Sequence, residues 1–416
     1  MEIKANLNNP ETLEKLYRDD RKAFKAEFEK LYPEIENRES ARFWKARLEF
    51  DNKTEILKSI SFTELIPVAV VCLITAFLVK IPDIFPVGLS DEIFYMKNVA
   101  IIVFLGLSLY TIRTSKLTEI RLVLTGLAFL ISAVYANFLP SNDPADQVIL
   151  VYIHLPLLMW FIYGVVFIGY DFGNMKKRID FIKFNGDLAI FYALIAIAGG
   201  ILTGITIGLF ESIGIKIEEF YFQNIVITGA VAAPVVASFL IEKFPSLISK
   251  AAPLIASIFS PLVLITLVVF LVTILSTGKD PYNDRDFLLI FNIMLLGVMG
   301  IIIFAVSETS AIRFQKFNAI VLFSLSIVTI LIDLIALSAI FYRLGEYGLT
   351  PNRLAVLVSN ILVLVNLLLI MIDLFKTNFR GKEFSIVENT VARFLPVYLV
   401  RIILVVFGFP VIFGMN

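Results

Sequence analysis

The chain has 416 residues, of which 58% are hydrophobic and only 17% are charged, and its mean hydropathy is +0.85. Soluble domains are about 45–50% apolar and about 25% charged, so this composition excludes an ordinary soluble protein and indicates one that crosses a membrane. The 36 basic residues balance the 36 acidic residues, which argues against a nucleic-acid partner. One cysteine and one histidine are too few for the usual zinc sites. We therefore expect no cofactor and no His/Cys metal site, although an all-carboxylate site stays open.

The first 60 residues are strongly charged and contain short apolar repeats typical of amphipathic helices. Asn9 is a suitable N-cap for the first of them, and Pro33 is expected to end the second. The favoured interpretation is a cytoplasmic helical region, 1–60, that lies on the membrane with its aromatic side chains at the lipid interface. The alternative is a docking site for a cytoplasmic protein partner within residues 10–50.

The remainder, 61–416, is predicted to be a transmembrane helical domain. A membrane-spanning helix needs about 20 mostly apolar residues, and the chain has eleven such segments. They predict an all-α fold, a polytopic transmembrane helix bundle of about eleven spans. The predicted spans are 62–79, 99–113, 121–139, 148–169, 187–210, 221–241, 253–276, 286–306, 319–341, 354–375 and 394–414.

The basic residues of the loops predict which side of the membrane each loop faces, because cytoplasmic loops are enriched in lysine and arginine. If the N-terminus is cytoplasmic, the inner loops hold fifteen basic residues and the outer loops seven. Thirteen more precede the first span. We therefore expect a cytoplasmic N-terminus and a C-terminus on the outside.

Polar residues recur inside the predicted spans, where ionisable groups are costly and usually face protein or water. The deep ionisable residues are Asp333 on span nine, Arg401 on span eleven and His154 on span four. By the helical rise, His154 and Asp333 both come out roughly 9 Å from the outer edge of the bilayer core. Asn366 on span ten and Tyr398 on span eleven complete the set. We expect spans nine to eleven to turn these residues toward a shared interior, together with span four or span one.

Two interpretations of that interior are equally open. The first is a set of interhelical hydrogen bonds that fixes packing and binds no ligand. The second is a functional cavity.

Small residues recur every four positions on the fifth span, at Ala196, Gly200 and Gly204, and the sixth span contains Gly229 and Ala233. Such a stripe lets two helix backbones approach closely. We therefore expect spans five and six to cross closely at these residues.

The turn between spans nine and ten, YRLGEYGLTPNR, is unusually polar. Gly348 is expected to end the first helix in a left-handed conformation, and Thr350 to cap the next. Arg343 and Arg353 lie at this outer end, where they are able to attract an anion, a phosphate or a lipid headgroup. The alternative is that Glu346 neutralises one arginine while the other anchors at the interface.

The same string, Tyr342-Arg343, then Tyr347-Gly348-Leu349-Thr350 and Arg353, resembles the signature Y-R-x-x-x-Y-G-L-T-x-x-R of a bacterial multipass membrane family. That family is catalogued as domain of unknown function forty-one fifty-three. The resemblance covers residues 60–414 and implies a bacterial inner-membrane protein, without implying an activity.

The chain has no phosphate-binding glycine loop, which argues against a self-powered pump. The leading interpretation is a secondary transporter or permease for a small solute or anion, linked to protons through His154 and Asp333. One alternative is a membrane-embedded transferase that acts on a lipid-linked substrate, and another is a non-catalytic subunit or sensor with a cytoplasmic docking tail. An enzyme is the less favoured class. The residues expected to line the pathway are Asp333, Arg401, His154, Asn366, Tyr398, Arg343 and Arg353.

Overall fold

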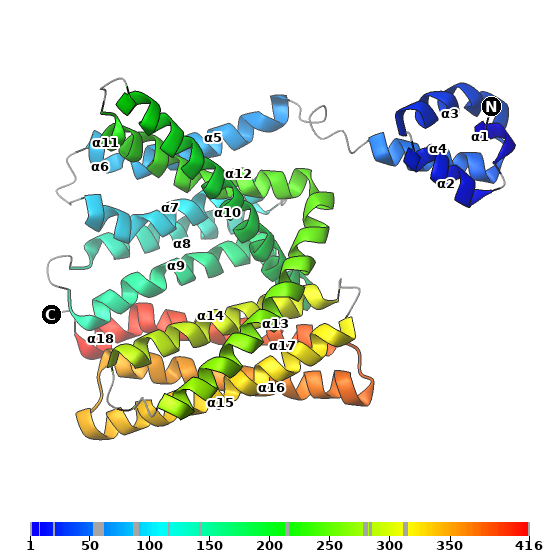
Figure 1. Ribbon diagram of the computed structural model, residues 1–416. Helices are drawn as coiled ribbons and strands as arrows, with labels where there is room; N and C mark the ends of the chain where they lie inside the picture. Colours follow the sequence, from blue (N-terminus) through cyan, green and yellow to red (C-terminus); the bar gives the residue numbers. More distant parts are fainter. Residues whose placement is uncertain are drawn as a thin grey trace. The chain divides into compact units, whose positions relative to one another are not determined.

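The computed structural model describes residues 2–7, 9–19, 21–52, 62–85, 91–114, 117–140, 144–212, 216–277, 282, 285–310 and 315–414. Within these residues every regular element is a helix and none is a strand. The chain divides into two compact units, Met1–Ile66 and Pro67–Asn416, whose helices are labelled in Figure 1.

The N-terminal unit contains four helices: α1 (Glu2–Ala5), α2 (Pro10–Asp19), α3 (Arg21–Ile35) and α4 (Glu39–Asn52). The side-chain oxygen of Asn9 accepts a hydrogen bond from the backbone N–H of Thr12 at 3.2 Å, which confirms the predicted cap. The prediction that Pro33 ends its helix is wrong, because α3 continues to Ile35.

The aromatic side chains of this unit pack against one another, and not against lipid as predicted. Tyr17, Phe24 and Trp44 are buried, and their ring centroids lie 4.9–5.6 Å apart. Four short helices fold over one another, so their apolar faces bury a common core that also contains Phe28 and Leu48. The expectation of aromatic rings at the lipid interface is therefore corrected: the unit has its own hydrophobic core.

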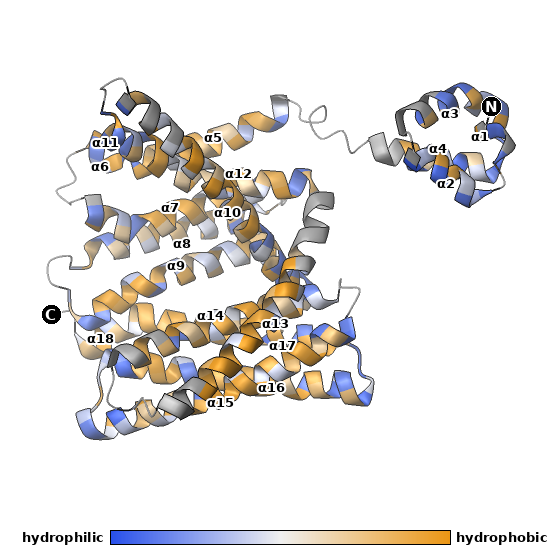
Figure 2. Cartoon of the chain, in the orientation of Figure 1, coloured by the Kyte–Doolittle hydropathy of each residue, from blue (hydrophilic) through white to orange (hydrophobic). Residues whose placement is uncertain are grey.

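Ten helices in the described part of the second unit are long and apolar enough to cross a membrane, and α5 is a shorter apolar helix. Figure 2 shows apolar residues along their lengths and polar residues near many of their ends. An all-α polytopic bundle is thereby confirmed. All the described α-helices of this part of the chain, short ones included, are α5 (Phe62–Val79), α6 (Ile81–Ile84), α7 (Asp91–Thr114), α8 (Glu119–Phe138), α9 (Asp146–Phe167), α10 (Met175–Ser212), α11 (Glu218–Tyr221), α12 (Ile227–Lys243), α13 (Pro245–Thr277), α14 (Arg285–Thr309), α15 (Gln315–Tyr347), α16 (Pro351–Arg380), α17 (Ser385–Ile403) and α18 (Phe409–Phe413).

Two stretches of π-helix interrupt the spanning segments, and the sequence does not predict them. They are η1 (Phe222–Val226), between α11 and α12, and η2 (Leu404–Gly408), between α17 and α18. A π-turn has one residue more per hydrogen-bonded ring than an α-turn, so it displaces the backbone locally and is frequent at functional sites. The last span is thus one segment, Ser385–Phe413, with an irregular turn inside it.

Of the apolar cores among the described helices, one is contributed mainly by α10 and α13 to α17 and a second mainly by α7, α8, α9 and η2. Figure 1 shows α15 and α16 as an antiparallel hairpin. Helix α9 contacts both α16 and α17, so it joins the second core to the C-terminal helices. This brings the fourth, ninth, tenth and eleventh predicted spans together.

Helices α10 and α12 contact each other, but the stripe of small residues on α10 does not make that contact. A Cβ atom added to Gly200, Gly204 or Gly229 would meet no atom within 4 Å. The prediction of a close crossing at these glycines is therefore wrong. Small residues permit close approach of two helices without requiring it.

Buried polar side chains join α7 to α8 near the end of α8. Lys97 is only 1% exposed and donates to the backbone carbonyl of Leu139 at 2.7 Å. The side-chain amides of Asn98 and Asn137 donate to each other's oxygens at 3.1 and 2.8 Å. Because the charge of Lys97 is directed at the C-terminal carbonyls of a helix, it is favourably placed without a carboxylate partner.

Candidate functional site

One face of α15 places three polar side chains in the interior of the spanning unit. Ser326, Thr329 and Asp333 are separated by three and four residues, so they share a helix face, and each is fully buried. The hydroxyl groups of Ser326 and Thr329 donate to carbonyls one turn earlier on their own helix, at 2.8 and 2.7 Å. Both carboxylate oxygens of Asp333 are buried and have no hydrogen-bond partner among the residues that the structure describes. Asp333 is thus the unsatisfied member of this face.

The next two helices supply an amide and a phenol. Asn366 on α16 is fully buried, and its Nδ2 donates to the hydroxyl oxygen of Tyr398 on α17 at 3.0 Å. The Oδ1 atom of Asn366 has no partner. Tyr398 is also close enough to Asp333 for their charges to interact. The three side chains therefore form one polar group across α15, α16 and α17.

Arg401 lies one turn after Tyr398, on the same helix. Its guanidinium donates to the backbone carbonyl of Ala355 on α16 at 3.1 Å, and its Nε has no hydrogen-bond partner. The π-helical segment η2 begins three residues later, and within it the carbonyl of Val406 accepts a hydrogen bond from the hydroxyl of Tyr135 at 2.7 Å. An interhelical hydrogen bond from α8 thus satisfies one carbonyl of the irregular turn beside the site.

His154 on α9 belongs to the same group, although its neighbour differs from the expected one. Its Nδ1 lies 2.8 Å from the carbonyl of Leu150, and since a carbonyl only accepts, Nδ1 carries the hydrogen. The charge that acts on His154 is that of Arg401, and within the described residues no interaction joins His154 to Asp333. His154 therefore lies near the charge of Arg401, because α9 packs beside α17, and its predicted part in proton linkage with Asp333 stays a prediction.

We call Asp333, Asn366, Tyr398, Arg401 and His154 the buried polar cluster. It presents three oxygen atoms and one guanidinium nitrogen that have no hydrogen-bond partner, namely Oδ1 and Oδ2 of Asp333, Oδ1 of Asn366 and Nε of Arg401. The three oxygens lack a hydrogen-bond donor, which a proton, a cation or a polar solute is able to supply, and the nitrogen lacks an acceptor, which a polar solute is able to supply. The cluster contains the pathway residues that the sequence predicts inside the bilayer.

The turn between α15 and α16 has the local structure that the sequence predicts. Helix α15 ends at Tyr347, Gly348 has φ +72°, and the Thr350 side chain accepts a hydrogen bond from the backbone N–H of Arg353 at 3.3 Å. The guanidinium of Arg353 donates to the carbonyls of Tyr347 and Gly348, both at 2.7 Å. Its side chain is therefore engaged in holding the turn.

The two arginines of the turn share one aromatic ring. The guanidinium carbon of Arg353 lies 5.4 Å from the ring centre of Tyr347, and that of Arg343 lies 5.9 Å from it. Within the described residues no ion pair joins Glu346 to either arginine, so the alternative in which Glu346 neutralises one of them gains no support from a direct contact. Within the described residues, Nη1 of Arg343 is buried and has no hydrogen-bond partner, so the attraction of an anion to this end stays a prediction.

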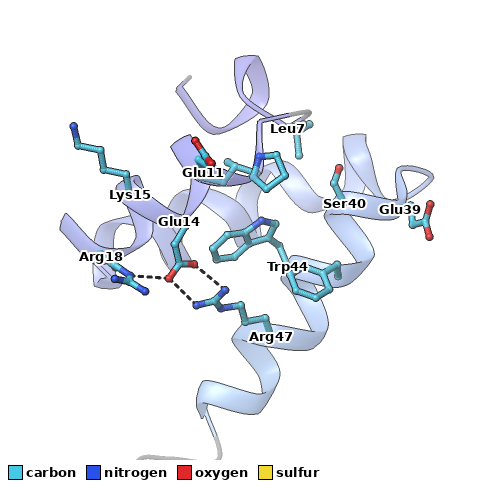
Figure 3. A pocket seen from close by; sticks show the side chains of 12 residues that line it. Leu7, Glu11, Glu14, Lys15, Arg18, Glu39, Ser40, Trp44 and Arg47 are labelled. Carbon is cyan, nitrogen blue, oxygen red and sulfur yellow. Dashed lines mark hydrogen bonds and ion pairs between the residues drawn. The ribbon is translucent and has the colours of Figure 1, made fainter. Parts of the chain in front are cut away.

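A groove of about 1010 Å³ lies on the N-terminal unit between α2 and α4 (Figure 3). Trp44 and the exposed side chain of Phe43 contribute its apolar part. At its edge, Glu14 is held between Arg18 at 2.8 Å and Arg47 at 2.7 Å. Of the aromatic residues that suggested a docking surface, Phe43 is the one left 62% exposed. A partner for this unit stays a prediction.

Sequence reasoning missed the burial of Lys97, which it placed in an outer loop. The signal was present, because Lys97 is followed by Asn98 and by a long apolar run, which allows the helix to start earlier. The structure indeed begins α7 at Asp91.

Comparison with protein-family models, with curated proteins and with solved structures finds no match for this chain. The geometry of the buried polar cluster is therefore the basis for assigning a function.

Proposed function

We propose that this polytopic membrane protein is a proton-linked secondary transporter for a small polar solute or anion, with Asp333 as its proton-binding group. The observation that carries the proposal is the full burial of Asp333 with no partner for either oxygen. An ionised carboxylate buried without a counter-charge costs several kcal/mol. Such a group is retained where it binds and releases a proton or cation during function.

The neighbours of Asp333 support the proposal by their chemistry. Asn366 and Tyr398 provide groups that both donate and accept hydrogen bonds, while the unpartnered Nε of Arg401 provides a donor for an anionic group. The charge that acts on His154 is that of Arg401, which belongs to the same interior cluster. The arrangement therefore favours a pathway through the bundle over lipid chemistry at its surface.

The family and the cellular location are part of the same proposal. The turn signature supports membership of the family called domain of unknown function forty-one fifty-three, and hence a bacterial inner membrane. The loop charges support a cytoplasmic N-terminus and an external C-terminus. Fusion of alkaline phosphatase or of green fluorescent protein to the C-terminus tests the orientation. The phosphatase fusion should be active and the fluorescent fusion dark, and the reverse result would contradict it.

Transport is tested in proteoliposomes that enclose a pH-sensitive dye. A panel of small organic anions and neutral polar solutes is added outside, and we expect one class to cause proton movement with the wild-type protein. Asp333→Asn should abolish this movement while the protein remains folded by tryptophan fluorescence. Arg401→Ala should weaken it, and Ser338→Ala, on the exposed side of α15, serves as the control. Solute-dependent proton movement that persists in folded Asp333→Asn protein would refute the role of Asp333.

A further inference from the structure

A pair of carboxylates, separate from the buried polar cluster, lies beside a close contact between α10 and α14. Gly186 of α10 faces the ring of Phe304 of α14 so closely that an added Cβ would lie 2.1 Å from a ring carbon. Asp187 follows Gly186 in the chain, and Glu308 lies one helical turn after Phe304, on the same face of α14. The contact of Gly186 with the Phe304 ring therefore brings the two carboxylates near each other, and their charges interact.

Neither carboxylate is satisfied by the protein. Glu308 is only 5% exposed and forms no hydrogen bond or ion pair with any residue that the structure describes. The Oδ1 atom of Asp187 is likewise buried without a partner. The hydroxyl groups on either side of Glu308, those of Ser307 and Thr309, donate to carbonyls of their own helix at 2.7 Å each. They are therefore not available to the carboxylate.

The surrounding charges leave the pair short of positive charge. Lys183, one turn before Asp187, attracts both carboxylates. Glu388 of α17 adds a further negative charge near Glu308, and the hydroxyl of Ser310 donates to it. One lysine thus faces three carboxylates, and the C-terminal end of α14, which carries the negative pole of its helix dipole, adds to the imbalance.

Two carboxylates that repel each other, of which Glu308 is buried and Asp187 is half-buried, are stabilised by a positive charge between them. Within the described chain no three acidic, histidine or cysteine side chains lie close enough together to hold a metal ion. A divalent ion, which takes six or more oxygen ligands, is therefore poorly matched to the pair.

We propose that Asp187 and Glu308 form a binding site for one monovalent cation, a proton or Na⁺, at the contact between α10 and α14. The site shares no residue with the buried polar cluster, and it does not depend on whether the protein transports a solute. Binding of the cation removes the repulsion between the two carboxylates and so stabilises the contact of the two helices.

The test measures the thermal unfolding midpoint of the full chain in detergent. Sodium chloride is exchanged for choline chloride at constant ionic strength, and the series is repeated over a range of pH. If Na⁺ is the ligand, the midpoint rises linearly with the logarithm of Na⁺ concentration above saturation. If the ligand is a proton, the midpoint is insensitive to Na⁺ and falls as the pH is raised. A midpoint that responds to neither would overturn the proposal.

The variants assign the response to the pair. Glu308→Gln and Asp187→Asn keep the side-chain shape and remove the charge, so each should abolish the response. Glu211→Gln alters an exposed carboxylate at the other end of α10 and should respond as the wild type does. A wild-type response in folded Glu308→Gln protein would overturn the site.

A measurement on the wild-type chain keeps the test independent of variant folding. A carbodiimide that reacts with buried carboxylic acids should label Asp187 or Glu308, with the position located by mass spectrometry. Labelling that Na⁺ suppresses supports the sodium form, and labelling that Na⁺ leaves unchanged but high pH suppresses supports the proton form. Absence of label at both residues under every condition would count against the pair.

Discussion

Replacement of Asp333 by leucine distinguishes a functional carboxylate from one that fixes packing. Leucine has the same branching as aspartate, and the substitution removes two buried oxygens that have no hydrogen-bond partner. Leaving a buried polar group unsatisfied costs about 1–3 kcal/mol. Removal of the Asp333 carboxylate should therefore raise the free energy of unfolding by an amount of that order. The larger volume of leucine opposes this gain by an overpacking penalty of about 1–3 kcal/mol, and a matched control is needed to cancel it.

Asn360 on the neighbouring helix provides that control. It is 2% exposed, and unlike Asp333 it is partnered, since its Nδ2 donates to Oδ1 of Asn292 at 2.7 Å. Asn360→Leu carries a comparable volume change but loses an interhelical hydrogen bond, which averages about 0.6 kcal/mol and reaches about 1.7 kcal/mol inside membranes. Asp333→Leu removes an unsatisfied group, whereas Asn360→Leu loses a hydrogen bond, so we expect Asp333→Leu to be the more stable variant by about 2–5 kcal/mol.

The assay is reversible unfolding in mixed micelles of a mild detergent and dodecyl sulfate, followed by tryptophan fluorescence. The free energy of unfolding of each variant is compared with that of the wild type. If Asp333→Leu is destabilised as much as Asn360→Leu, then Asp333 has a stabilising partner in the folded state. The buried polar cluster would then be a packing device, and the argument for a proton-binding group would fail.

Three further changes test other parts of the structure. Arg353→Ala removes two hydrogen bonds to carbonyls of the α15–α16 turn and should speed hydrogen–deuterium exchange of that turn by about tenfold or more, since hydrogen bonds of charged groups contribute about 1.5–3 kcal/mol; unchanged exchange would contradict its bracing role. The hydrogen bond from Arg18 holds the pKa of Glu14 below its usual value, so this stabilisation is present at neutral pH and is lost as the pH falls through the folded-state pKa. In a chain whose other tryptophan is replaced, Trp44 fluorescence should show that acid lowers the stability of the N-terminal unit. Glu14→Gln should make this loss of stability smaller. Lys97→Met leaves buried carbonyls at the end of α8 unsatisfied and should lower the free energy of unfolding by about 1–3 kcal/mol, and a neutral effect would show that its charge is not needed.

Features that depend on a few neighbouring residues could be predicted from the sequence. The turn at Gly348 and Thr350 is correct because a left-handed glycine and an N-cap are local requirements of the backbone. Ten of the eleven predicted spans correspond to described helices long and apolar enough to cross a membrane, and the first, 62–79, corresponds to the shorter apolar helix α5; the bilayer imposes a length and an apolar composition on every crossing helix. The burial of Asp333 and Asn366 followed from the same principle, since a polar side chain in a span turns away from lipid.

Features that depend on which helices meet could not be predicted in the same way. The glycine stripe on α10 was expected to face α12, but nothing in a single helix states where its partner lies. The pairing of Glu308 with Asp187 was missed for the same reason, because the two are distant in the chain and meet only through the contact of Gly186 with Phe304. His154 was assigned to Asp333 by depth alone, and depth does not fix the direction in which a side chain points around the helix.

The buried polar groups of the spanning unit differ in whether the protein supplies both halves of their hydrogen bonds. Asn360 meets Asn292, and Asn98 meets Asn137, so amide donors face amide acceptors. Amides suit this purpose because each carries both a donor and an acceptor. An ionised carboxylate only accepts, so a group used purely for packing gains nothing from being an aspartate.

Asp333 and the Asp187–Glu308 pair present acceptor oxygens without protein donors, at two separate places in the spanning unit. An acceptor oxygen that lacks a protein donor is satisfied by a proton or by another positive charge. A cation that binds and is released supplies this charge. Both proposals therefore rest on acceptor oxygens that have no hydrogen-bond donor from the described part of the protein. The experiments distinguish the two proposals. Substitution of Asp333 should leave unchanged the response of the unfolding midpoint to Na⁺ or pH, and substitution of Glu308 should leave unchanged the gain in stability from Asp333→Leu.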